Sequence, residues 1–122
     1  MEFDLQSSRP IWLQLAEQLS RRIVTGVYAP GSRFPTVREL AAEAGVNPNT
    51  MQCALAQLES AGLVTTNRTA GRTVTEDIAV LDAMRAQLAK ELRDKYFSEM
   101  EALGFSRAEA AAMAAAEKER TV

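Results

Sequence analysis

Apolar residues recur at steps of three and four through most of the chain, which is the spacing of residues that share one face of a helix. The first such stretch begins after Pro10 and ends at Gly26. Its apolar stripe consists of Ile11, Trp12, Leu15, Ala16, Leu19 and Ile23. We expect these side chains, Trp12 included, to pack in a core. Ahead of them, Phe3 and Leu5 alternate with polar residues, which predicts a short extended arm.

Local signals place two further helices close together. Thr36 and Glu39 have the spacing of a capping box, which predicts a helix that starts after Thr36 and stops near Gly45. The next helix starts at Asn47, a good N-cap residue, and stops at Gly62. Its apolar face consists of Met51, Ala54, Leu55 and Leu58. Two helices joined by a tight glycine turn are the helix-turn-helix signature.

Two β-prone runs follow the second of these helices. Residues 63–66 and 72–75 are separated by a loop that carries Arg68 at its tip, which predicts a β-hairpin. Earlier in the chain, Pro30-Gly31 is a turn signal, and Arg33-Phe34 is long enough only for a single β-bridge. A hairpin directly after a helix-turn-helix is a wing, and an arginine at its tip is placed to enter a minor groove or to bind phosphate.

The pattern becomes helical throughout from Asp77 onward, and an apolar seam runs for about seven turns. Ile78 begins the seam, and its other members, for which we predict a role in dimerisation, are Leu81, Met84, Leu88, Leu92, Tyr96, Met100 and Leu103. Gly104 then ends this helix, and Ser106 with Glu109 caps a last helix over roughly residues 107–120. We expect the two helices to form a dimerisation hairpin, because the apolar stripe is otherwise exposed.

The predicted fold class is mainly α with a small β-hairpin. It is a winged helix-turn-helix followed by a two-helix C-terminal dimerisation hairpin. We expect residues 1–76 to form the winged domain and residues 77–122 the dimerisation tail. A chain of 122 residues is long enough for one compact domain with an appendage of this kind.

Composition excludes several kinds of chemistry. The 122 residues include no histidine and one cysteine, Cys53, which leaves no imidazole for general base catalysis, no obvious metal site and no internal disulfide. We therefore expect a protein that is not an enzyme and that uses no cofactor or metal. No apolar run approaches the roughly 18 residues of a membrane span, and the first residues do not resemble a signal peptide. We expect a cytoplasmic protein with no membrane partner.

Arginines are the charged residues that point most directly to a nucleic-acid partner. Residues 1–76 balance seven arginines against seven carboxylates, and arginine makes bidentate contacts to phosphate and guanine. An arginine-only set also arises from genomic base composition. Arg38 lies in the first turn of its predicted helix, where it is either placed for an external anion or paired with Glu39 or Glu43.

Amides mark the solvent face of the helix that follows the tight turn. Asn49 and Gln52 suit the reading of adenine edges or contacts to phosphates. A neutral face of this kind is also ordinary solvated surface, and the helix alone does not decide between the two. A winged domain that serves only for protein association is a further hypothesis, and the charge balance of the first 76 residues is consistent with it.

Five motifs lie along the chain in a fixed order: Pro10-Ile11-Trp12, residues 26–31 between two glycines, Phe34-Pro35-Thr36-Val37-Arg38-Glu39-Leu40-Ala41, Val46-Asn47-Pro48-Asn49-Thr50 and Leu58-Glu59-Ser60-Ala61-Gly62-Leu63. Together they resemble the GntR family of bacterial transcription regulators. The Asn-Pro-Asn-Thr run and the short two-helix tail resemble its YtrA subfamily. The resemblance extends over nearly the whole chain.

This resemblance implies a sequence-specific DNA-binding regulator, commonly a repressor, that binds an inverted-repeat operator as a homodimer. It places the third helix of each protomer in a major groove and the wing along the adjacent minor groove. Carried over to this sequence, the implied DNA contacts are Thr36, Arg38, Asn47, Asn49, Thr50, Gln52, Arg68, Thr69, Gly71 and Arg72. The implied partners are double-stranded operator DNA and a second copy of the chain. A small-molecule effector is compatible with the family, and the sequence does not identify one.

Overall fold

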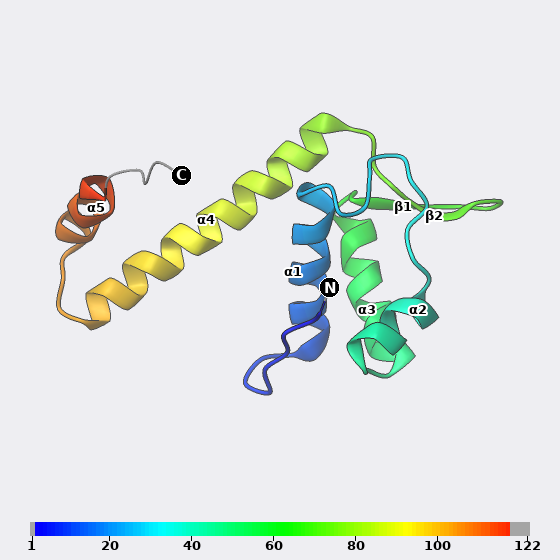
Figure 1. Cartoon of the computed structure of the whole chain (residues 1–122), viewed down its shortest axis with the longest axis horizontal. Helices are drawn as coiled ribbons and strands as arrows, with labels where there is room; N and C mark the ends of the chain where they lie inside the picture. The colour runs from blue at the N-terminus through cyan, green and yellow to red at the C-terminus, as the bar shows by residue number, and fades with distance from the viewer. Residues whose placement is uncertain (1, 118–122) are drawn as a thin grey trace. The chain divides into compact units, whose positions relative to one another are not determined.

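The computed structural model describes residues 2–117, and the chain divides into two compact units, Met1–Arg85 and Ala86–Val122. The helices and strands are α1 (Ile11–Val24), α2 (Val37–Ala44), α3 (Pro48–Ser60), β1 (Val64–Asn67), β2 (Gly71–Val74), α4 (Ile78–Ala102) and α5 (Arg107–Ala116) (Figure 1). In the described part of the chain, five helices thus accompany one two-stranded antiparallel sheet. The predicted mainly α fold with a small β-hairpin is confirmed.

The first unit is built on a core shared by α1, α2 and α3. The predicted apolar faces supply it, with Leu15, Leu19 and Ile23 from α1, Leu40 and Ala41 from α2, and Met51, Ala54, Leu55 and Leu58 from α3. Trp12 is an exception: it is 38% exposed and lies outside the core cluster, so the prediction that it packs in the core is wrong. Ile11 packs against the core from the same turn, and Trp12 is about 100° further around the helix.

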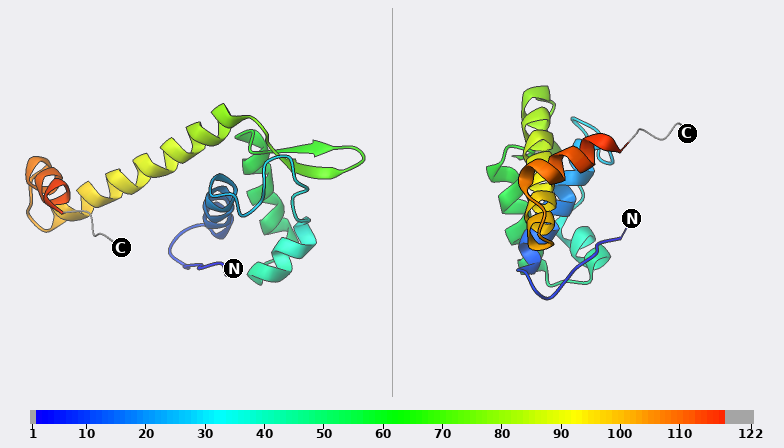
Figure 2. Two further views of the ribbon diagram at one scale, coloured as in Figure 1. Left: turned by 45° about the horizontal axis from the view of Figure 1, so that its top comes forward. Right: turned by 90° about the vertical axis from the view of Figure 1, so that its left-hand side faces the viewer.

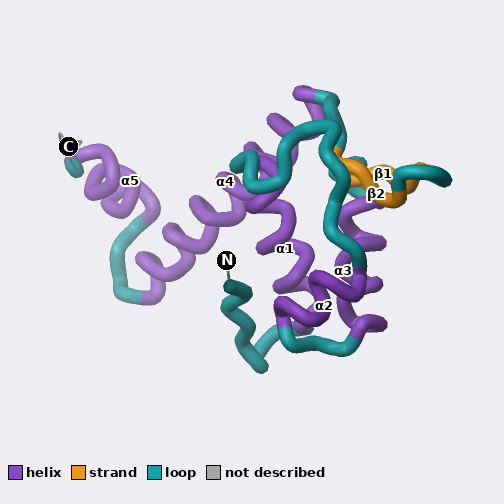
Figure 3. Tube along the Cα trace, turned by 45° about the vertical axis from the view of Figure 1, so that its right-hand side comes forward, coloured by secondary structure: helices purple, strands orange, loops and turns teal. Residues whose placement is uncertain are grey.

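The turn between α2 and α3 is set by local bonds. Glu39 N donates to Thr36 Oγ1 at 3.1 Å and the Glu39 side chain accepts from Thr36 N, which completes the predicted capping box. Gly45 follows α2 with a φ of +69°, a left-handed conformation that glycine adopts without a steric penalty from Cβ. Asn47 then caps α3. Figure 3 shows the resulting short loop between the two helices, and both predicted boundaries are confirmed.

The β-hairpin is joined along β2 by a third segment. β1 and β2 pair antiparallel, with Thr66 opposite Arg72. Phe34 N donates to Arg72 O at 2.8 Å, and an isolated antiparallel bridge joins Arg33 to Thr73. The predicted single bridge is therefore confirmed, and its partner is β2. Figure 2 shows the tip of the hairpin standing clear of α1, α2 and α3.

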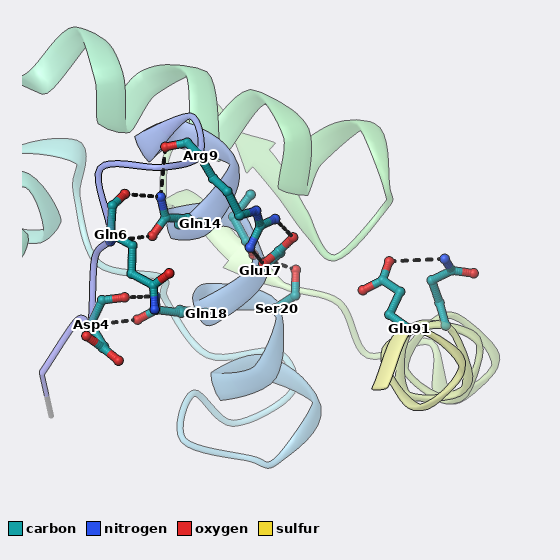
Figure 4. Close-up of polar contacts among 10 residues, drawn as sticks. Asp4, Gln6, Arg9, Gln14, Glu17, Gln18, Ser20 and Glu91 are labelled. Carbon is teal, nitrogen blue, oxygen red and sulfur yellow. Dashed lines mark hydrogen bonds and ion pairs between the residues drawn. The ribbon is translucent and has the colours of Figure 1, made fainter. Parts of the chain in front are cut away.

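The N-terminal arm lies along α1, where two glutamines one turn apart hold its backbone (Figure 4). Gln6 N donates to Gln14 Oε1 at 2.7 Å, and Asp4 N donates to Gln18 Oε1 at 3.0 Å. Gln14 Nε2 and Gln18 Nε2 donate back to the carbonyl oxygens of Gln6 and Asp4 at 2.6 and 2.7 Å. The apolar side chains of the arm pack against the core, so the arm forms part of the first unit.

The first turns of α4 also belong to the first unit. Leu81 is 8% exposed within the core cluster, and Met84 packs against that cluster. Arg85 Nη2 donates to Val24 O at 2.6 Å, which satisfies a carbonyl at the C-terminal end of α1. The structure thus places Leu81 and Met84, two residues of the predicted dimerisation seam, in contacts within their own chain.

In the second unit, the rest of α4 is followed by α5. Phe105 N donates to Met100 O and Gly104 N to Glu101 O, the two bonds of a Schellman motif, so the predicted end of this helix is confirmed. Ser106 and Glu109 form the predicted capping box at the start of α5. Tyr96 OH donates to Ala110 O at 2.7 Å and ties the two helices together. The predicted extension of the last helix to residue 120 lies outside the described residues.

Within residues 2–117 no helix combines the length and the apolar character that crossing a bilayer requires. The same residues contain no group of three or more potential metal-ligating side chains.

Candidate nucleic-acid interface

The solvent face of α3 carries the amides that the sequence singles out. Asn49 and Gln52 are exposed, and Thr50 is half-buried. Met51 and Leu55, on the opposite face, are fully buried, so the orientation of α3 is fixed by its packing. The exposed side chains are therefore presented by a helix that is held in place by the core, with Cys53 exposed beside them.

The start of α3 is specified by Asn47. Its Oδ1 accepts from Asn49 N at 2.7 Å, which satisfies one of the free N–H groups of the first turn. Pro48 takes the first helical position, where a missing N–H has no cost. The side-chain oxygen of Asn47 is thus committed to the helix end, although the residue itself is exposed.

A groove of about 300 Å³ lies between the start of α2 and the start of β2. Four of the residues predicted to contact DNA line it, namely Thr36, Arg38, Gly71 and Arg72. Arg33 lines the same groove and was absent from the predicted set. Its side chain reaches this place because the Arg33–Thr73 bridge holds the chain beside β2. That long-range pairing is not visible in the sequence around Arg33.

Arg38 is exposed and makes no ion pair within residues 2–117. The two carboxylates considered as partners are engaged elsewhere. Glu39 accepts from Thr36 in the capping box, and Glu43 accepts from Arg22 at 2.7 Å. The surface ion pair is therefore not formed, and the guanidinium of Arg38 stands in the first turn of α2, where the helix dipole disfavours a cation.

The tip of the hairpin is a turn held by Asn67. Its Oδ1 accepts from Thr69 N and Thr69 Oγ1, both at 2.9 Å, so the hydroxyl of Thr69 is used inside the loop. Gly71 starts β2 with a φ of +74°, which a side chain would strain. Arg68 lies on this turn, is exposed and has no ion-pair partner in the described residues.

Arg72, by contrast, has a partner in its own chain. Arg72 Nε donates to Glu59 Oε1, and Thr66 Oγ1 donates to the same oxygen at 3.1 Å. The bond from Arg72, with the second from Thr66, holds the pKa of Glu59 below its usual range although burial opposes the shift. Sequence reasoning missed Glu59 as a site residue. The available signal was a carboxylate in the last turn of a helix, where the dipole disfavours a negative charge.

The match to a known family covers the elements that build this surface. The family model for bacterial regulatory proteins of the gntR family matches residues 12–74, from α1 to the end of β2. The chain belongs to the GntR family. The resemblance proposed from the five motifs is confirmed.

Two curated relatives of this GntR-family chain extend the similarity into the tail. The HTH-type transcriptional regulator YhcF of Bacillus subtilis, named as uncharacterized, is 36% identical over 109 residues, which cover 89% of this chain and 90% of that protein. The HTH-type transcriptional repressor YtrA of the same organism is 30% identical over 107 residues, which cover 83% and 82%. The similarity to YtrA agrees with the predicted subfamily.

Solved structures support the fold of this GntR-family regulator. A GntR family transcriptional regulator from Listeria monocytogenes is 34% identical with a TM-score of 0.80, covering 93% of this chain and all of that one. The DNA-binding domain of AraR, solved in complex with its operator ORE1, is 30% identical with a TM-score of 0.52, covering 62% of this chain and 94% of that one. The winged helix-turn-helix prediction is confirmed by these likenesses.

The predicted contacts of this GntR-family chain fall into three places. The start and solvent face of α3 carry Asn47, Asn49, Thr50 and Gln52. The groove beside α2 brings together Thr36, Arg38, Gly71 and Arg72, and the hairpin tip carries Arg68 and Thr69. Four of the ten already make side-chain bonds within the chain that limit their freedom: Thr36 with Glu39 in the capping box, Asn47 in its cap, Thr69 with Asn67, and Arg72 with Glu59.

Proposed function

We propose that this regulator binds a specific DNA operator, with α3 in the major groove and the hairpin along the neighbouring minor groove. The observation that carries this proposal is Arg38. It is an exposed cation at the start of a helix, without an ion-pair partner in residues 2–117, in a groove shared with Arg33 and Arg72. An anion in that groove gains charge-assisted bonds from these arginines, and a DNA phosphate is the anion found beside a recognition helix.

Different residues have different roles in this proposal. Asn49, Thr50 and Gln52 contact base edges or nearby phosphates from α3. Asn47 acts mainly by fixing where α3 starts. Arg68 reaches the minor groove or its phosphates from the hairpin tip, whereas Thr69 shapes the turn that carries it. The AraR domain bound to its operator is a structural neighbour that supports this arrangement.

We further propose that the regulator is a homodimer on an inverted-repeat operator, with residues 77–122 as its dimerisation tail. Support comes from apolar side chains of the second unit that are exposed in the single chain. Leu92 is 52% exposed, Leu103 is 74% exposed and Met113 is 47% exposed. Leu88, which is 9% exposed, and the half-buried Tyr96 and Met100 complete the proposed contact set. Leu81 leaves it because it belongs to the core of the first unit, and Met84 because it is half-buried against that core.

The proposed role of the dimer is repression of transcription in the cytoplasm, without catalysis and without a cofactor. The matched relatives are named as transcription regulators, and one of them as a repressor. The sign of regulation rests on that relative alone. A small-molecule effector is left open, because no feature of the described residues selects one.

The test is selection of bound duplexes from a random-sequence DNA library, followed by titration of the recovered duplex by fluorescence anisotropy. We expect enrichment of an inverted repeat and an affinity that falls with salt by about −0.9 in slope per phosphate neutralised. A reporter gene placed behind the recovered sequence should be less expressed when the protein is present. Absence of enrichment, with a salt-independent affinity equal to that for random duplex, contradicts DNA recognition and favours a domain for protein association.

A further inference from the structure

One carboxylate connects α3 to both strands of the wing. Thr66 on β1 and Arg72 on β2 are directly opposite each other in the hairpin register. Both donate to the same oxygen, Glu59 Oε1, with Thr66 Oγ1 at 3.1 Å and Arg72 through Nε. The last turn of the helix proposed to read DNA is therefore tied to a matched pair of residues across the hairpin.

This tie matters because the hairpin is small. Each strand has four residues, and an isolated two-stranded hairpin is at best marginally stable in water. Val64 and Val74 anchor its base in the core, and the residues beyond Thr66 are exposed. The bonds of Glu59 lie between the buried base and the exposed tip, so they restrict how the wing is directed relative to α3.

The same bonds orient Arg72. A guanidinium has five N–H donors, and the bond from Nε to Glu59 leaves the terminal nitrogens available. The side chain of Arg72 is 21% exposed and lines the groove that contains Arg38. A planar group held by one edge presents its other edge in a fixed direction, which reduces the entropy lost when that edge binds.

We propose that Glu59 is a positioning residue for DNA binding, which fixes the wing to α3 and presents the terminal nitrogens of Arg72 to a phosphate in the groove beside Arg38. This inference rests on the proposed function, since it concerns how the same surface meets DNA. The low pKa of Glu59 supports it, because the carboxylate stays charged and the bonds persist through the neutral range.

Positioning and simple charge repulsion predict opposite changes in DNA affinity when Glu59 is replaced. Glu59 is a negative charge close to a surface for DNA, so repulsion alone predicts tighter binding when the charge is removed. Positioning predicts weaker binding, because the wing and Arg72 lose their fixed direction. The direction of the change therefore distinguishes a positioning residue from a merely tolerated carboxylate.

The experiment compares Glu59→Ala, Glu59→Gln and the control Glu76→Ala, using the inverted-repeat duplex recovered from the random library. Glu76 is an exposed carboxylate just after β2 with no hydrogen bond or ion pair in the described residues. Its side chain lies beside Gly31, so its removal takes away a negative charge and a packing contact with that turn but breaks no polar bond. We expect Glu59→Ala to weaken binding roughly tenfold, on the scale of one immobilised side chain per protomer. Glu59→Gln keeps an acceptor for Arg72 and should recover part of this loss, and Glu76→Ala should bind as tightly as the unaltered chain or slightly more so.

Two further measurements separate positioning from general damage. The Nε–H resonance of Arg72 in ¹⁵N spectra of the DNA-free protein should be resolved at neutral pH and should move to the position of a solvated arginine in Glu59→Ala. In an Arg72→Ala background, Glu59→Ala should cause a clearly smaller loss, because only its bond to Thr66 is then removed.

The outcomes are distinguishable from those for the proposed function. If the unaltered chain binds no duplex selectively, DNA recognition itself fails. If the unaltered chain binds selectively and Glu59→Ala binds equally well or more tightly, the positioning role is overturned. It is also overturned if Glu59→Ala lowers the affinity by the same factor in the Arg72→Ala background as in the unaltered chain. Circular dichroism of each variant identifies unfolding, and in that case the Glu59→Gln comparison and the Arg72 resonance decide the question.

Discussion

Arg22 Nη2 of α1 donates to Glu43 Oε2 of α2 at 2.7 Å, and this ion pair joins two helices of the first unit. Arg22 Nη1 also donates to Tyr28 OH at 2.7 Å, and the ring of Phe3 lies 4.1 Å from the guanidinium carbon. Because Arg22 is only 6% exposed, Glu43 is the carboxylate that balances a buried positive charge. The guanidinium of Arg22, on α1, therefore contacts both the N-terminal arm and α2 beside the core.

Replacing Glu43 by alanine should lower the free energy of unfolding by about 2 kcal/mol, since a buried guanidinium loses a charged hydrogen-bond partner. The matched control is Glu17→Ala. Glu17 pairs with Arg9, whose side chain is 47% exposed, and an exposed pair contributes less than about 1 kcal/mol. Urea unfolding followed by circular dichroism measures both, and equal losses for the two variants contradict a special role of the Arg22 pair.

Arg38→Ala should weaken DNA binding, because one phosphate contact per protomer is lost. The slope of the logarithm of the binding constant against the logarithm of the salt concentration should become shallower by about 0.9 per protomer. The stability of the fold should be unchanged, because Arg38 makes no ion pair in residues 2–117. Arg93→Ala removes the same charge from the exposed surface of α4 and serves as the control. A salt slope that changes equally in both variants would show that Arg38 contributes only net charge.

The bond between Glu59 and Arg72 should be present at neutral pH and lost in acid. The pKa of Glu59 is lowered in the folded chain, so the pair stabilises the fold fully above the ordinary glutamate pKa of about 4.3. This contribution disappears as the pH falls below that value and through the folded pKa. In a pH titration, the chemical shift of the Arg72 Nε–H resonance should change with a midpoint below the ordinary pKa of glutamate. A midpoint above that pKa argues against the pair.

The position of the C-terminal cut should decide whether the first unit remains stable. A chain ending at Arg85 keeps Leu81 in the core and the bond from Arg85 to Val24, so it should fold with a stability close to that of the first unit in the whole chain. A chain ending at Glu76 loses Leu81 and should be less stable by about 2 to 4 kcal/mol. Urea unfolding of the two truncations tests this difference, and equal midpoints refute it.

Leu92→Lys should convert the proposed dimer into a monomer, because it places a charge on an apolar side chain that is 52% exposed in the single chain. Light scattering during size-exclusion chromatography gives the mass. Lys90→Ala, at an exposed position of the same helix, is the control and should stay dimeric. A dimer that survives Leu92→Lys places the interface outside the proposed contact set. Another surface of the chain must then link the two DNA-binding units that occupy the inverted repeat.

The sequence by itself determined where most elements begin and end. The capping box of Thr36, the turn at Gly45 and the N-cap Asn47 act through bonds between residues at most four apart, so their spacing carries the information. The buried faces of α1, α2 and α3 followed from helical periodicity in the same way, except at Trp12. The family resemblance drew on these same stretches, and it supplied the candidate DNA contacts.

Only the tertiary structure decided which of these side chains have partners. The pairing of Glu59 with Arg72, the place of Arg33 in the groove and the burial of Leu81 all join residues distant in sequence. Periodicity assigns Leu81 to an apolar face but does not say which surface covers that face. In the same way, a charge pattern shows that arginines are present, whereas the folded chain determines that Arg22 and Arg72 are neutralised internally while Arg38 faces solvent. The physical reason is that local bonds depend on spacing along the chain, whereas packing and ion pairs depend on how the elements meet in space.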